Sequence, residues 1–341
     1  MKPRITWKAA LLPVIGILAF LIYLYLFDVD VVKIIETARY VDLSIYFVSI
    51  LFVFVDTFFY ALSWQSLLSF LSVRLPIVNA CLYVWYGTFI DVIVPAGSIS
   101  GEVSKLYLVT REMPGTGGKV IATLVTQRLI SIGTIIASLI IGVAVVSAER
   151  PITGLPFGLT LFFAVSTILI LILFVVLCFK EAWMRKFIDT MVGFVNYVSG
   201  GRWDLTKAKE DAIKAVRMFR DSMKEFGRGP KTLFASILFV AVAWLSHLSI
   251  AYLVFLALNF HVQWSVVLLA CSIAIVLPAR GLPEIAMVTV FTLLGVPAEI
   301  GATATILTRI LTFWLRFFLG FFAQQWVEIQ SINTSANTTK A

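Results

Sequence analysis

The sequence predicts an all-α, polytopic integral membrane protein with about six transmembrane helices and two re-entrant helical hairpins. Apolar residues make up 60% of the 341 residues, charged residues make up 13%, and the mean hydropathy is +0.98. A soluble globular protein has an apolar share of about 45–50%. Long apolar segments alternate with shorter ones that are interrupted at proline and glycine. These observations exclude a soluble globule and predict a chain that crosses a lipid bilayer several times.

Six apolar segments are long enough to cross the bilayer, because each is near or above the ~20 residues that ~30 Å of hydrocarbon requires. The first follows Lys2, Arg4 and Lys8 and has no small-residue cleavage site behind it. We therefore expect it to stay as the first span and not to be removed as a signal peptide. The six segments cover approximately residues 9–27, 43–71, 120–146, 155–179, 233–258 and 300–326.

Four shorter apolar segments remain, and none of them crosses the bilayer comfortably alone. They cover residues 80–94, 99–109, 266–277 and 285–294, and the two members of each pair are separated by a kink that contains a proline. Two short helices joined at such a kink can enter the membrane and return on the same side if their tip is buried in protein or lines water. These segments therefore predict the two re-entrant hairpins.

The positions of Lys and Arg near the segment ends predict the sidedness of the protein. The N-terminus is basic, and the connection over residues 180–231 carries twelve Lys and Arg against seven Asp and Glu. We expect both regions, and the C-terminus, to be cytoplasmic in a cell membrane. The first hairpin then enters from the cytoplasm and the second from the exterior, which predicts an inverted repeat of the kind found in secondary transporters.

This topology divides the chain into five parts. They are a first repeat at 1–150, a fourth span at 151–179 that opens the second repeat, a cytoplasmic connection at 180–231, the rest of the second repeat at 232–328, and a polar tail at 329–341. From about Thr206, the connection has apolar residues at helical spacing with basic residues on the other faces. Such a helix is suited to an anionic membrane surface. The alternative is a linker that only joins the two halves.

The two hairpin regions share an ionisable motif. In each, a kink with a proline is followed by a glutamate and then, about 25 residues later, by an arginine, giving Glu102 with Arg128 and Glu284 with Arg309. Interrupted helices at corresponding positions of two halves indicate the binding site of a transporter. An ionisable group inside hydrocarbon costs several kcal/mol unless it is paired or hydrated, so these residues are functional candidates.

Two interpretations of these groups stay open. The glutamates and arginines form buried ion pairs that hold the hairpins in place, or the arginines and the N-termini of the half-helices bind an anion, most naturally a phosphate. Lys105, one turn beyond Glu102, and Arg280, at the second kink, add positive charge to the candidate substrate-binding site.

Two aspartates are candidates for coupling, because Asp56 is predicted in the middle of a span and Asp91 just before the first kink. Each either takes up a proton during transport or satisfies a local polar contact. Neither a metal nor a cofactor site is predicted, because the two histidines are isolated and the three cysteines have no paired spacing.

The motifs resemble the membrane domain of the lysylphosphatidylglycerol synthase/flippase family, over about residues 10–326. The residues that carry the resemblance are Pro95–Gly97, Gly101–Glu102, Lys119–Thr123, Gln127–Leu129, Arg280–Glu284, Leu294–Pro297 and Thr308–Trp314. The resemblance implies a domain that moves aminoacylated phospholipid between leaflets, with Glu102, Arg128, Glu284 and Arg309 at the matching positions. The chain departs from the Pro-Gly-Gly-like tip of the family at Arg280–Pro283. We expect no aminoacyltransferase domain after residue 326, and therefore no synthesis of a lysyl lipid.

We therefore expect a transporter of the flippase type that moves a phospholipid or a lipid-linked anionic headgroup, and not an enzyme. No nucleic-acid partner is expected. One alternative is a membrane-embedded transferase with a polyprenyl-phosphate donor, in which Asp28 and Asp30 hold a metal; these residues otherwise form an ordinary polar loop. The other is a non-catalytic membrane scaffold.

Overall fold

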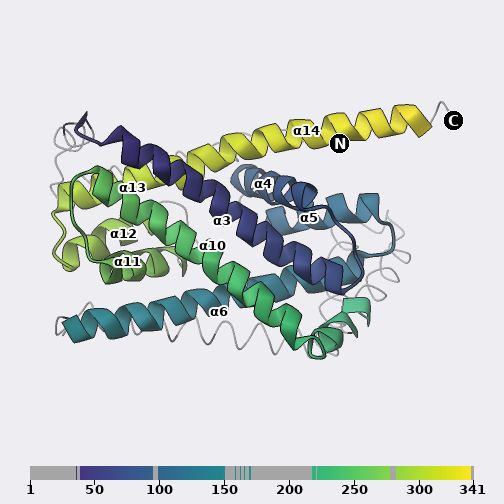
Figure 1. Cartoon of the computed structure of the whole chain (residues 1–341), viewed down its shortest axis with the longest axis horizontal. Coiled ribbons are helices and arrows are strands. Elements are labelled where there is room, and N and C mark those ends of the chain that lie inside the picture. Colours follow the sequence, from purple (N-terminus) through teal and green to yellow (C-terminus); the bar gives the residue numbers. More distant parts are fainter. Residues whose placement is uncertain are drawn as a thin grey trace, which may run out of the picture.

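The computed structural model describes residues 39–94, 99–149, 217–219, 221–276 and 282–338, together with a few isolated positions. Every regular element in these ranges is helical (Figure 1). The first half contains α3 (Leu43–Phe70), α4 (Ile77–Ile93), α5 (Ile99–Glu112) and α6 (Gly117–Glu149). The second half contains α10 (Pro230–Ala257), α11 (Trp264–Val276), α12 (Leu282–Leu293), α13 (Ala298–Arg309), the π-helical segment η1 (Ile310–Leu315) and α14 (Arg316–Thr338). Each half thus has a long helix, two short ones and a long one.

Four helices are long and apolar enough to cross a membrane: Leu43–Phe70, Gly117–Ala148, Pro230–Ala257 and the continuous helix Ala298–Ile329. They confirm the all-α polytopic class and coincide with four of the six predicted spans. The other two predicted spans, over residues 9–27 and 155–179, lie outside the described residues or touch them only at isolated positions. An α-helix suits such apolar sequences because it satisfies its own backbone hydrogen bonds in a medium without water.

The two halves meet along α3 and α10, which lie antiparallel across the centre of the molecule (Figure 1). At one end, the Asp42 amide donates to the Ala257 carbonyl at 2.8 Å. Toward the other end, the hydroxyls of Ser66 and Ser236 are 2.8 Å apart. Small residues allow the backbones of membrane helices to approach closely. The halves therefore run in opposite directions, as an inverted repeat requires.

Each half packs its pair of short helices against the last long helix of the other half. Helix α4 lies along α14, where a Cβ added at Gly320 would be 2.7 Å from Cβ of Phe89. Helix α11 lies along α6, where a Cβ at Gly142 would be 3.3 Å from Cα of Leu269. The α4–α5 and α11–α12 pairs lie toward opposite ends of the molecule (Figure 1).

Each short pair also begins and ends at the same end of the bundle. The Lys119 ammonium, at the start of α6, donates to the Leu71 carbonyl at the end of α3 at 3.0 Å, so α4 and α5 leave and return to one place. In the second half, the ring of Phe291 near the end of α12 contacts that of Phe255 near the end of α10, with centroids 4.9 Å apart. The structure therefore forms two helical hairpins, whose re-entry into a membrane stays a prediction.

The last part of the basic connection packs against protein. Phe219 and Phe226 are buried in a cluster with residues of α3 and α6, and the Phe226 ring stacks on Phe70 at 5.6 Å. These side chains lie on the apolar face of the predicted amphipathic helix, so at this end that face contacts the bundle and not a lipid surface. Most of the predicted helix, from Thr206 to residue 216, lies outside the described residues.

Candidate binding site

The first hairpin is closed by Asp91. Its Oδ1 accepts hydrogen bonds from the Ser100 hydroxyl at 2.7 Å and from the Gly101 amide at 2.6 Å, so the carboxylate caps the first turn of α5. Gly101 lies directly against Gly87 of α4, where a Cβ at Gly87 would be 3.0 Å from the Gly101 carbonyl oxygen. Asp91 therefore makes the local polar contact that the sequence leaves as one alternative, and its coupling role stays a hypothesis.

Glu102 lies in the first turn of α5 and pairs with Lys105. The Lys105 Nζ is 2.8 Å from Glu102 Oε2, and only 4% of the lysine side chain is exposed. Its ammonium also lies over the rings of Trp64, at 5.2 Å, and Tyr60, at 5.7 Å. One of the two interpretations of the sequence pairs Glu102 with Arg128. In the structure the partner of Glu102 is Lys105, because a residue three positions along the same helix lies on the same face.

Arg128 on α6 is consequently left without a carboxylate. It is exposed, and it forms no ion pair with any part of the chain that the structure describes. The neighbouring Gln127 amide donates to the Tyr60 carbonyl at 2.7 Å and holds α6 against α3 at this level.

The second hairpin forms its predicted pair. Arg309 Nε, at the end of α13, is 2.7 Å from Oε1 of Glu284, in the first turn of α12. The side chains of Arg309 and Glu284 are 30% and 23% exposed, so the pair is only partly buried. Glu284 Oε2 is buried and has no hydrogen-bond partner. Arg280 lies outside the described residues, as do the kinks at 95–98 and 277–281.

A third cluster, which the sequence did not predict, surrounds the buried Asp56 of α3. Arg316, the first residue of α14, forms an ion pair with Asp56 Oδ2, and His247 Nδ1 of α10 is 3.4 Å from the same oxygen. The His247 ring stacks on the Trp244 indole at 5.4 Å with 10° between the planes. Arg316 falls within the last predicted span. Because a charged residue inside a span is a functional candidate, the sequence alone could have identified it.

The π-helical segment η1 explains why Arg309 and Arg316 contact different helices. In an uninterrupted α-helix, residues seven positions apart lie only about 20° apart around the axis. Between these arginines, however, the helix widens over Ile310–Leu315. One extra residue in a wide turn rotates the rest of the helix by about 100°. Arg309 can therefore face α12 while Arg316 faces α3.

The three clusters succeed one another through the bundle. Arg309 and Arg316 flank η1 on one continuous helix, and Asp56 and Tyr60 are one turn apart on α3. Since Lys105 lies over the Tyr60 ring at 5.7 Å, the three clusters form a series of charged and aromatic side chains from Glu284 through Asp56 to Glu102. Within the described ranges, no three His, Cys, Asp or Glu side chains are grouped to hold a metal ion. The chemistry that these groups offer is ion pairing and hydrogen bonding to an anion.

The fold and the charged clusters define a polytopic, all-helical membrane protein built from two antiparallel halves, each with a broken-helix hairpin. The family sequence model of the lysylphosphatidylglycerol synthase TM region matches residues 10–320, and the chain belongs to that family. It is similar to a UPF0104 membrane protein from Pyrococcus horikoshii, at 21% identity over 92% of this chain and 95% of the relative. It is also similar to a UPF0104 membrane protein from Methanocaldococcus jannaschii, at 25% identity over 95% of this chain and 96% of the relative.

Proposed function

We propose that this protein is a flippase that moves a phospholipid or another lipid with an anionic headgroup between the two leaflets. The observation that carries the proposal is the difference between the two halves. Arg309 is neutralised by Glu284 at 2.7 Å, whereas Arg128, at the corresponding position, has no carboxylate partner among the described residues. An arginine within the hydrocarbon region needs a counter-charge or water, and a substrate phosphate can supply that counter-charge.

The chemistry of arginine favours phosphate as the ligand. A guanidinium presents a planar set of N–H donors that matches two phosphate oxygens at once, which an ammonium cannot do. The proposed headgroup enters the polar region between α3, α5 and α6. There Lys105 and Glu102 neutralise each other, so Arg128 supplies the positive charge that the headgroup binds. The hydrocarbon chains stay in the bilayer. In this mechanism the protein moves a lipid and breaks no covalent bond.

The packing of the hairpins supports a way to expose the site alternately to the two sides. Because α4 packs on α14 and α11 packs on α6, a shift of either hairpin would displace the long helix of the other half that it contacts. Rocking of one repeat against the other is how many transporters with inverted repeats expose a central site. The Asp56–Arg316 pair lies where such a shift would be transmitted, between α3 and α14.

The proposal is tested with purified protein in liposomes. The measurement is the rate at which fluorescent phosphatidylglycerol, and separately polyprenyl phosphate, becomes accessible at the opposite leaflet. Arg128→Lys keeps the charge but loses the two-oxygen geometry, so we expect a rate about ten times lower, equivalent to about 1.4 kcal/mol. Arg228→Lys, at an exposed arginine before α10, is the matched control and should be unchanged. Wild-type rates for both lipids in folded Arg128→Lys protein would refute the anion site.

A further inference from the structure

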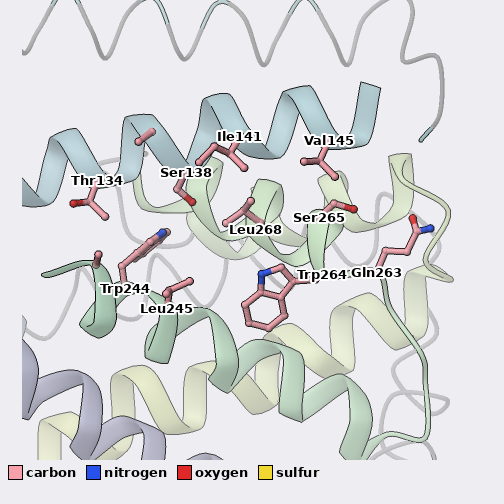
Figure 2. A pocket seen from close by; sticks show the side chains of 12 residues that line it. Thr134, Ser138, Ile141, Val145, Trp244, Leu245, Gln263, Trp264, Ser265 and Leu268 are labelled. Atoms are coloured by element: carbon pink, nitrogen blue, oxygen red, sulfur yellow. The ribbon is translucent and has the colours of Figure 1, made fainter. Parts of the chain in front are cut away.

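A groove lies between α6, α10 and α11 (Figure 2), and none of the residues that line it belongs to the hairpin ion pairs. Its volume is about 570 Å³, within the range of about 300–1,000 Å³ that ligand pockets occupy. Its walls are almost wholly apolar. The lining residues are Thr134, Ala137, Ser138, Ile141 and Val145 of α6, Ala241, Trp244 and Leu245 of α10, and Gln263, Trp264, Ser265 and Leu268 at the start of α11.

The groove is elongated along α6. Its residues from Thr134 to Val145 recur every three or four positions, so they form one stripe on the helix. Eleven residues of α-helix span about 16 Å at 1.5 Å per residue. The hydrocarbon core of a bilayer is ~30 Å thick. The stripe therefore has the length of the hydrocarbon chains in one leaflet.

The two ends of the groove differ (Figure 2). Gln263 and Trp264 form one end, at the start of α11, and an amide beside an indole is typical of a membrane–water interface. Trp244 lies at the other end, near the middle of α10. Its side walls include Ile141 and Leu245, which are 54% and 51% exposed, so the groove is open along its side.

Trp244 gives the inner end a polar group as well. The residue is only 9% exposed, and its indole Nε1 is buried without a hydrogen-bond partner. The same ring stacks on His247, which lies beside Asp56. The groove and the Asp56–Arg316 cluster therefore share a wall, and at that wall lies a buried N–H group without a hydrogen-bond partner.

We propose that this groove binds one acyl chain of a membrane phospholipid, with the headgroup at Gln263 and Trp264 and the chain running toward Trp244. The inference rests on the proposed function and identifies where the hydrocarbon chain of the transported lipid binds. A groove one leaflet long fits a phospholipid chain, whereas the isoprenoid chain of a polyprenyl phosphate is several times longer. As the headgroup moves inward, an ester or phosphate oxygen accepts the hydrogen bond of Trp244 Nε1, next to the charged cluster.

The first experiment is native mass spectrometry of the full chain in detergent, with phosphatidylglycerol or polyprenyl phosphate added in parallel. We expect the wild type to retain one phosphatidylglycerol. Ala137→Trp fills the groove and should reduce that retention at least ten-fold, while Ile140→Trp, on the same helix but outside the groove, should retain the lipid. Equal retention by all three proteins would overturn the proposal, and so would retention of polyprenyl phosphate alone.

A second measurement covers the case in which Ala137→Trp does not fold. One molar equivalent of phosphatidylglycerol with brominated chains is added in detergent, and the quenching of tryptophan fluorescence is recorded. Quenching should fall in Trp244→Phe and not in Trp314→Phe, whose ring is exposed elsewhere; equal quenching in both would reject the groove. Both readouts report binding alone, so a protein that retains the lipid but moves none would reject the proposed function and leave the groove in place.

Discussion

At the scale of single residues, the two hairpins neutralise their glutamates differently. Glu102 is neutralised within its own helix by Lys105, whereas Glu284 is neutralised by Arg309 from the next helix. The first arrangement leaves Arg128 without an ion pair among the described residues, whereas the second keeps Arg309 in an ion pair with Glu284. Since a buried charge that loses its partner is strongly destabilising, the two arginines should respond differently to neutralisation.

We predict that Arg309→Gln lowers the stability of the protein in detergent by about 2–4 kcal/mol, because it leaves the Glu284 carboxylate without its partner. Arg128→Gln, the matched variant in the first half, should lower it by less than about 1 kcal/mol, because no pair is broken. Thermal unfolding of both variants, followed by circular dichroism, measures the difference.

A double-mutant cycle then separates the ion pair from other effects of the substitution. Adding Glu284→Gln to Arg309→Gln removes the uncompensated charge and should restore part of the lost stability. Strictly additive losses in the double variant would show that the contact between Glu284 and Arg309 contributes little to the folded state.

At the scale of elements, the first hairpin depends on close contact between α4 and α5. Asp91 caps α5 at the Gly101 amide, and Gly87 and Gly101 bring the two backbones together. This contact needs the absence of a side chain, because a Cβ at Gly101 would be 2.6 Å from the Gly87 carbonyl oxygen and would also meet the Asp91 carboxylate. Backbone atoms cannot move aside as the end of a flexible side chain can.

Gly101→Ala should therefore destabilise the protein by about 1–3 kcal/mol, the usual cost of overpacking. Gly133→Ala is the control, because a Cβ there would meet nothing within 4 Å and alanine favours a helix by about 1 kcal/mol relative to glycine. Unfolding temperatures measured in one detergent compare the two. A Gly101→Ala protein as stable as Gly133→Ala would mean that α4 and α5 do not approach as closely as the structure has them.

At the scale of the whole molecule, the antiparallel pairing of α3 with α10 places the two hairpins toward opposite ends of the bundle. Arg111, at the end of the first hairpin, and Phe260, in the loop before the second, consequently lie toward opposite ends of the bundle. The bias of basic residues predicts that the side of Arg111 is the cytoplasm.

We expect single cysteines at these two positions, in a chain without its natural cysteines, to react from opposite sides. An impermeant maleimide added to intact cells should label the cysteine at 260 and should label that at 111 only after the membrane is opened. Labelling of both positions in intact cells would place Arg111 and Phe260 on one side and exclude the inverted repeat.

Much of this architecture was determined by the sequence alone. The length of each apolar segment predicted the long helices, and the kinks with proline predicted the short pairs, because backbone hydrogen bonding and segment length are local properties. The pairing of Glu284 with Arg309 was one of the two interpretations that the sequence left open, and the structure has it.

Only the tertiary structure decided which charges meet. Lys105 takes the place of Arg128 as the partner of Glu102, and the wide turn of η1 directs Arg316 to Asp56, which His247 also approaches. The apolar groove likewise exists only where α6, α10 and α11 come together. These features depend on the rotation of each helix about its axis and on its neighbours, and every residue of a uniformly apolar helix is equally suited to lipid or protein. Hydropathy along the chain therefore cannot specify which face turns inward.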